Sequence, residues 1–388
     1  MRKLLFLSLS FALLTACSRA RQEFQQSQLP PANTSTPATI NPGSSGPTTN
    51  SFADIVDRAA PAVVTIHSAR VVRTPRQHQF FDDPRFREFF GLPRAPAPQQ
   101  QQQVRGLGSG VIVTADGYIL TNHHVIDGAE EITVELSDER TFSAKLVGSD
   151  PPSDLAVLKI DQSNLPVLNI GDSDRARVGD MVLAIGNPLG LEQTVTAGII
   201  SAKGRSTGLS DGTFEDFLQT DAPINQGNSG GALISAATGE LIGINSQILS
   251  PTGGNIGIGF AIPVNMAKNV MDQLVKTGGV HRGSLGVTIQ PLTPEAISKL
   301  GLQSARGALV NSVVPGGPAD RAGVRGGDVI ISVNGTQIND TNALRNVIAR
   351  TPPGSDVTLG VWRNSREEQI HVKLGELNIP TRPAQPSE

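Results

Sequence analysis

The feature that most constrains the fold is a series of short apolar runs separated by Gly, Asp and Pro. Each run has the length of a β-strand, and no long helical pattern interrupts the series before residues 263–276. Many short strands with turn residues between them are typical of an all-β barrel architecture. The sequence therefore predicts a mainly β domain at residues 51–275. The runs lie at residues 63–66, 110–113, 118–120, 131–136, 155–160, 181–185, 194–201, 232–234, 241–245 and 257–262.

A serine stands among glycines in the segment Gly227-Asn228-Ser229-Gly230-Gly231. A serine hydroxyl becomes a useful nucleophile when a base takes its proton and backbone N–H groups hold the charge that its attack creates. Glycines on both sides let the backbone turn tightly and let a substrate approach closely. A lone segment of this kind is better explained as a flexible surface turn, so its interpretation depends on partners elsewhere in the chain.

Two upstream segments offer such partners. The segment TNHHV follows a strand-like run, and spacing alone does not choose between His123 and His124 as the base. Asp154 opens another strand-like run, where its carboxylate can accept the imidazole N–H and fix the tautomer. Taken singly, these residues fit a core histidine and a turn aspartate, and Asp150, which prolines follow, has the look of the latter. The chain order His, Asp, Ser is that of the chymotrypsin-like triad.

These segments resemble the Deg/HtrA family of trypsin-like serine proteases. The resemblance covers roughly residues 52–376 and rests on segments in the family's order: TNHHV, DPPSDLAVLK, IGNPLGLEQTVTAGIIS, DAPINQGNSGG and GGNIGIGFAIP. It implies two antiparallel β-barrels with the triad in the cleft between them. The family pattern assigns His124 as the base, Asp154 as its partner and Ser229 as the nucleophile, and it assigns the oxyanion hole to the backbone N–H groups of Gly227 and Ser229.

The resemblance also locates the substrate pocket. No Asp or Glu occurs in its two segments, and a pocket for Lys or Arg needs a buried carboxylate. We therefore expect cleavage after small or medium aliphatic residues such as Val, Ile or Ala. Gln226 and Pro223 stand where the family usually has Pro and Ala; without Pro to fix φ, we expect a less preset oxyanion loop. The pocket residues are Ile224, Asn225, Gln226, Ile244, Asn245 and Ser246.

From about Gly283 onward the sequence resembles a bacterial PDZ domain, which we place at residues 281–376. In such domains backbone N–H groups of one loop hold a terminal carboxylate, and the bound peptide adds a strand to the sheet edge. A helix expected at residues 342–349 should form one wall of the groove. The resemblance assigns the groove to Ser284, Leu285, Gly286 and Val287 in the loop and to Leu344, Val347 and Ile348 on the helix.

The first 17 residues form an export signal. Its apolar stretch, Leu4 to Leu14, is too short for a membrane span, which needs about 20 apolar residues. The signal ends in Leu-Thr-Ala-Cys, which resembles the bacterial lipobox, and Cys17 is the only cysteine, so a disulfide within the chain is impossible. We expect lipidation of Cys17 and a periplasmic, membrane-anchored protein. The alternative is cleavage after Ala16 or nearby, which would release a soluble periplasmic protein.

The remaining segments connect or extend the domains. Residues 18–50 are rich in Pro, Ser, Thr, Gln and Asn and are expected to form a disordered tether. In the family, the long loop expected at 68–107 is regulatory and often contacts a neighbouring subunit, which implies a homo-trimer or a multiple of trimers. Arg205 matches the basic position of a loop that senses the adjoining module, although a solvated surface arginine fits equally well. Residues 377–388 form a Pro-containing tail.

Composition excludes several other classes of function. The net charge of −3 gives no argument for nucleic-acid binding. The sequence has no nucleotide-binding P-loop and no clustered His/Cys spacing for a metal, so we expect no cofactor. The expected function is ATP-independent endoproteolysis of unfolded or damaged exported proteins, with the PDZ domain binding exposed peptide C-termini. The alternative is a chaperone (holdase) or scaffold in which proteolysis is minor or regulated.

Overall fold

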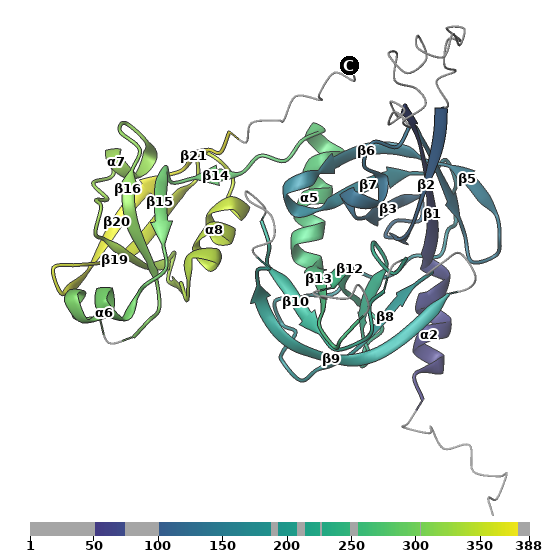
Figure 1. Cartoon of the computed structure of the whole chain (residues 1–388), viewed down its shortest axis with the longest axis horizontal. Coiled ribbons are helices and arrows are strands. Elements are labelled where there is room, and N and C mark those ends of the chain that lie inside the picture. Colours follow the sequence, from purple (N-terminus) through teal and green to yellow (C-terminus); the bar gives the residue numbers. More distant parts are fainter. Residues whose placement is uncertain are drawn as a thin grey trace, which may run out of the picture. The chain divides into compact units, whose positions relative to one another are not determined.

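Figure 1 shows the computed structural model of the chain. It describes residues 51–73, 101–187, 193–207, 214–225, 227–248, 255–302 and 304–378. The predicted export signal with Cys17, the predicted tether at residues 18–50, Gln226 and most of the predicted tail lie outside these residues. Within them, no helix has both the length and the apolar character needed to cross a membrane.

A short helix leads into the first sheet. Helix α2 (Ala53–Ala59) and the 3₁₀ turn η1 (Ala60–Ala62), which has Pro61 near its start, deliver the chain to β1. Seven antiparallel strands follow in the spatial order β5-β4-β1-β2-β3-β7-β6, which form an open half-barrel. The strands are β1 (Val63–Arg73), β2 (Gln101–Ile112), β3 (Tyr118–Thr121), β4 (Glu131–Glu135), β5 (Thr141–Ser143), β6 (Lys145–Asp150) and β7 (Leu155–Lys159).

The second sheet closes on itself in the order β10-β13-β12-β11-β8-β9. Three of its strands, β8, β12 and β13, are buried on both faces, which explains their continuous apolar runs. Helix α5 (Val264–Thr277) follows and ends at Gly278, whose φ of +73° suits a glycine C-cap. The strands are β8 (Met181–Gly186), β9 (Thr194–Arg205), β10 (Phe217–Thr220), β11 (Ala232–Ser235), β12 (Leu241–Ile248) and β13 (Gly259–Pro263).

The C-terminal part is a smaller α+β unit with its own apolar core. Its main sheet has the order β15-β16-β17-β19-β20, with β18 paired to β17, and β14 pairs with β21. Helix α8 (Thr341–Arg350) is capped at its N-terminus by Asp340, whose side chain accepts a hydrogen bond from the amide of Ala343. The other elements are β14 (Gly283–Ser284), β15 (Val287–Gln290), α6 (Pro294–Leu300), β16 (Ala308–Val313), α7 (Pro318–Arg321), β17 (Val329–Val333), β18 (Thr336–Gln337), β19 (Asp356–Arg363), β20 (Arg366–Lys373) and β21 (Gly375–Glu376).

The mainly β prediction, with a trypsin-like domain followed by a PDZ domain, is confirmed; the first of the two expected barrels is an open half-barrel. The long loop predicted at residues 68–107 is shorter than expected. Strand β1 continues to Arg73 and pairs without interruption with β2, which begins at Gln101. Backbone pairing extends both strands through a polar sequence that carries no apolar alternation. The rest of the loop lies outside the described residues.

Candidate active site

The pairing of β3 with β7 brings the candidate base to the candidate acid. Thr121 at the end of β3 lies opposite Ala156 near the start of β7, so the residues just beyond each strand end are neighbours. His124 lies in the short helix α4 (His123–Ile126), and its Nδ1 is 2.8 Å from Oδ2 of Asp154. The backbone N–H of His124 also donates to Oδ1 of Asp154 at 3.0 Å. The carboxylate therefore orients both the ring and the backbone of this histidine.

The backbone of Asp154 also helps to fix the position of this residue. Its φ of +55° is a left-handed conformation that few non-glycine residues adopt. Its carbonyl accepts from Asn122 Nδ2 at 3.0 Å and from the amide of His123 at 3.1 Å. The His123 ring takes no part in this contact: its Nδ1 is buried and has no hydrogen-bond partner among the described residues, and its Nε2 lies 3.6 Å from Asp127. The geometry thus distinguishes the two histidines that spacing left open.

Ser229 lies in the turn between β10 and β11, where two glycines have positive φ. Gly227 has φ +99° and Gly230 has φ +82°, values that disfavour any side chain. A Cβ on Gly230 would also lie only 2.1 Å from the carbonyl oxygen of Ser109. The amide of Gly230 donates to the carbonyl of Asn245 at 2.8 Å. These constraints fix the turn that carries Ser229.

The Ser229 hydroxyl donates to the carbonyl oxygen of Ser246 at 2.8 Å. The hydroxyl of Ser246 in turn donates to Oδ2 of Asp154 at 3.0 Å. Within the described residues, Ser229 and His124 share no hydrogen bond. A change of the Ser229 side-chain rotamer is needed to bring its hydroxyl to the imidazole, as is common in unliganded sites.

The predicted oxyanion hole consists of two backbone amides beside Ser229. Across the part of the chain that the structure describes, the N–H groups of Gly227 and Ser229 donate no hydrogen bond, whereas the amide of Asn228 between them donates to Asn225. Two unused donors that flank the hydroxyl are what an oxyanion needs.

His124, Asp154 and Ser229 line one cleft of about 560 Å³. Of the predicted pocket residues, Ile224, Asn225 and Ser246 line this cleft. Ile244 and Asn245 are 0% exposed and are not among the residues that line it. Gln226 lies outside the described residues. The lining also includes residues that the sequence did not point to: Pro151, Pro152, Ser153, Phe214, Glu215, Phe217, Gln247 and Ile248.

A second hollow, of about 640 Å³, lies between the loop at residues 283–287 and helix α8. Six of the seven predicted groove residues line it, namely Ser284, Leu285, Gly286, Val287, Leu344 and Ile348. Val347 instead packs against the apolar core, and Arg345 lines the hollow. The resemblance named three apolar residues of the helix for the groove, and in the structure two of them line the hollow.

No group of three or more His, Cys, Asp or Glu side chains in the described ranges is placed to hold a metal ion.

Comparison with known domain families gives two matches. The trypsin-like peptidase domain matches residues 108–244, and the PDZ domain matches residues 283–374. The first match contains all three candidate catalytic residues, and the second contains the predicted carboxylate-binding loop. The chain is a trypsin-like serine endopeptidase with a PDZ domain.

Relatives narrow this class further. The chain is 47% identical over 343 residues to the periplasmic serine endoprotease DegP of Escherichia coli K12. This alignment covers 84% of this chain and 72% of DegP. It is 48% identical over 334 residues to a probable periplasmic serine endoprotease, DegP-like, of Hahella chejuensis. That alignment covers 84% of this chain and 70% of the relative. The solved structure of the HtrA-type protease AlgW with a decapeptide is 48% identical, has a TM-score of 0.66, and covers 85% of this chain and 100% of that one. The chain belongs to the DegP family of HtrA-type serine endoproteases.

Proposed function

We propose that Ser229, His124 and Asp154 form the catalytic triad of this endopeptidase. The single observation that carries the proposal is the contact of both Asp154 oxygens with His124, whose ring lines the same cleft as Ser229. With its Nδ1–H held by the carboxylate, the imidazole presents Nε2 as a proton acceptor. Ser229 attacks the scissile carbonyl, and His124 takes its proton and passes it to the leaving amine. Water then hydrolyses the acyl-enzyme by the same route.

The amides of Gly227 and Ser229 would stabilise the oxyanion that forms during attack. Their lack of partners within the described residues supports this role. Gln226 precedes this pair in the sequence, and without the usual proline the loop is expected to be less preset. We expect this departure to alter the rate or the regulation of the enzyme and to leave the chemistry in place.

The cleft favours an aliphatic side chain before the cut. Ile224 lines it, and the two carboxylates that also do so are already engaged. Asp154 binds His124 and Ser246, while Glu215 accepts from Ser206 and Thr207. No carboxylate among the described lining residues is therefore free to bind Lys or Arg, which supports cleavage after Val, Ile or Ala.

We infer that the protein acts without ATP on unfolded or damaged exported proteins in the periplasm. The relatives of the chain include periplasmic serine endoproteases, which supports this setting. The hollow beside α8 would bind exposed peptide C-termini. AlgW structures with bound peptides are consistent with peptide recognition in the family. A lipid anchor at Cys17 and assembly into a homo-trimer or a multiple of trimers complete the proposal.

A second candidate function is that of a chaperone or scaffold in which proteolysis is minor or regulated. One observation favours it: the Ser229 hydroxyl is hydrogen-bonded to Ser246 and not to His124. Such a serine is not activated until its rotamer changes.

The test is casein digestion by wild-type protein and by the Ser229→Ala variant side by side. The protease proposal expects turnover to fall by roughly 10³-fold or more in the variant, with an unchanged fold. Residual cleavage near the wild-type rate would mean that another residue is the nucleophile. If the wild type itself hardly digests casein, yet both proteins suppress the aggregation of an unfolded protein, the chaperone function is the better account.

A further inference from the structure

The outer face of the PDZ sheet contains a hollow that cross-strand register creates. Ser332 on β17 lies opposite Gln337 on β18 and opposite Gly360 on β19, and Gly360 lies opposite Gln369 on β20. The two middle members of this row are small, and the two outer members are long and polar. The row therefore forms a floor with raised ends.

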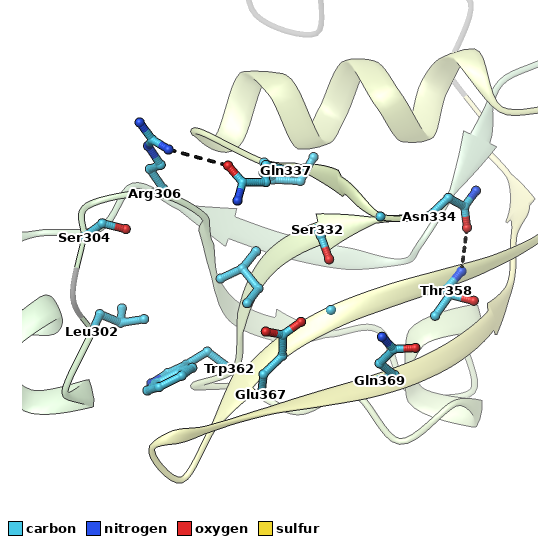
Figure 2. Close-up of a pocket in the computed structure, with 14 residues that line it drawn as sticks. Leu302, Ser304, Arg306, Ser332, Asn334, Gln337, Thr358, Trp362, Glu367 and Gln369 are labelled. Carbon is cyan, nitrogen blue, oxygen red and sulfur yellow. Dashed lines mark hydrogen bonds between the residues drawn. The ribbon is translucent and has the colours of Figure 1, made fainter.

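The neighbouring rows close the hollow on its other sides. Trp362 and Glu367 form the next cross-strand pair, and Asn334 and Thr358 lie on the opposite side (Figure 2). Arg306, two residues before β16 begins, completes the rim. The enclosed volume is about 720 Å³, within the range of roughly 300–1,000 Å³ that small-molecule sites occupy.

This hollow is separate from the predicted peptide groove. No residue that lines it also lines the hollow beside α8. The floor strands β17 and β19 each pair with a strand on both sides, so their backbones offer no edge to a ligand, whereas β20 and β18 lie at edges of the sheet. A ligand on the floor of the hollow is therefore recognised through side chains.

Some of these side chains are already fixed. The indole N–H of Trp362 donates to the carbonyl of Leu300 at 2.8 Å, which holds the ring in place. Asn334 accepts from the amide of Thr358 at 2.8 Å, and Arg306 reaches Gln337 only at 3.5 Å. An anchored aromatic ring loses little further freedom when a ligand packs against it.

Other polar groups have no partner. Within the described residues, the side chains of Ser332, Glu367 and Gln369 make no hydrogen bond. They supply a hydroxyl, a carboxylate and an amide, so donors and acceptors alternate over a short distance. Among the described lining residues, one guanidinium, that of Arg306, balances one carboxylate, that of Glu367, so their net charge is zero.

We propose that this hollow binds a neutral saccharide, such as one to three sugar units of a free oligosaccharide or of a glycan polymer. Sugar hydroxyls both donate and accept, so they match the mixed amide, carboxylate, guanidinium and hydroxyl groups. The apolar face of a sugar ring matches the side of Trp362. The unpaired carboxylate of Glu367 disfavours an anion, and the polar floor disfavours a purely apolar ligand.

The chain provides a direct reporter, because Trp362 is its only tryptophan. Intrinsic fluorescence of the full-length protein is titrated with chitotriose and with maltotriose, and saturation-transfer NMR of the same sugars gives a second readout. We expect a saturable change for at least one of them. Retention on insoluble chitin, released by the free sugar, then distinguishes a polymer ligand from a free oligosaccharide, and either source supports the proposal.

Variants locate the binding. Glu367→Ala and Gln369→Ala change exposed side chains and should each weaken binding by about tenfold, the value of one or two lost hydrogen bonds. Lys373→Ala, an exposed position on the same strand outside the hollow, serves as the matched control and should bind as the wild type does. The proposal fails if neither sugar gives a signal by either method, or if both sugar-site variants bind as tightly as the control. It also fails if inorganic phosphate displaces the sugar.

Discussion

Replacing Asp154 by Asn should remove most of the activity while leaving the fold intact. The hydrogen bonds around Asp154 determine how the new amide is oriented. The backbone N–H of His124 points at Oδ1 of Asp154 at 3.0 Å and is always a donor. In the variant, the amide oxygen must therefore occupy this position. The amide NH₂ then takes the place of Oδ2, which is the nearer carboxylate oxygen to His124 Nδ1, at 2.8 Å against 3.0 Å for Oδ1.

This orientation reverses the tautomer of the imidazole. The NH₂ group donates to Nδ1, so the ring proton moves to Nε2, and Nε2 no longer accepts the proton of Ser229. In serine-protease triads this change lowers kcat by about 10⁴-fold, which corresponds to about 5.4 kcal/mol of transition-state stabilisation. Here Ser246 also donates to Oδ2 at 3.0 Å, and its hydroxyl can rotate to accept from the NH₂, so the contact survives.

The assay is kcat on a peptide with Val before the cut, measured together with the midpoint of thermal unfolding. Asp127→Asn is the matched control, because Asp127 lies 3.6 Å from the ring of His123 and does not touch His124. We expect the control to retain wild-type kcat. An Asp154→Asn enzyme that keeps more than about a tenth of the wild-type kcat would refute the tautomer argument.

Three further predictions concern other parts of the chain. Arg363→Met should lower the free energy of unfolding by about 3–5 kcal/mol in urea titrations, because it leaves the buried carboxylate of Asp328 without its guanidinium; a loss below 1 kcal/mol would contradict this. Burial raises the pKa of Asp216, and its 2.8 Å ion pair with Arg350 offsets this rise only in part. The stability that Asp216 contributes is therefore present at acidic pH and is lost as pH rises through its folded-state pKa. Asp216→Asn should therefore raise the melting temperature at pH 7 and lose this gain on acidification; a lower melting temperature at pH 7 argues against it. His123→Gln should retain most of the activity on casein, and a loss as large as that of Ser229→Ala would mean that the wrong histidine was assigned.

Much of the fold could be predicted because apolar runs and turn residues report directly on strands. Helix α5 was expected at residues 263–276 and lies at Val264–Thr277, and each strand-like run overlaps a strand of the two sheets, with ends that extend up to two residues beyond the strand in some cases. Strands β5 and β6 were not predicted because their side chains are largely exposed and carry no apolar alternation. The end of β1 was missed for a related reason, since backbone pairing alone extends it.

In the site, too, the sequence indicated some features and not others. Motifs indicated His124, Asp154 and Ser229, since each stands beside a strand that the fold buries. The hydrogen bond from Ser229 to the carbonyl of Ser246 depends on a rotamer, which no sequence pattern encodes. The saccharide hollow was also beyond sequence reasoning, because its floor pairs Ser332 with Gly360 through a register that only the assembled sheet sets.

The most direct test of the account is reaction of the full-length protein with a fluorophosphonate, followed by mass spectrometry of its peptides. An activated serine attacks this phosphorus centre, whereas ordinary serines do not. We expect one adduct, on Ser229, and a labelling rate that falls sharply in the Asp154→Asn variant. An adduct on a different serine, or labelling of Ser229 at the same rate in wild type and variant, would contradict the claim that these residues act as one catalytic unit.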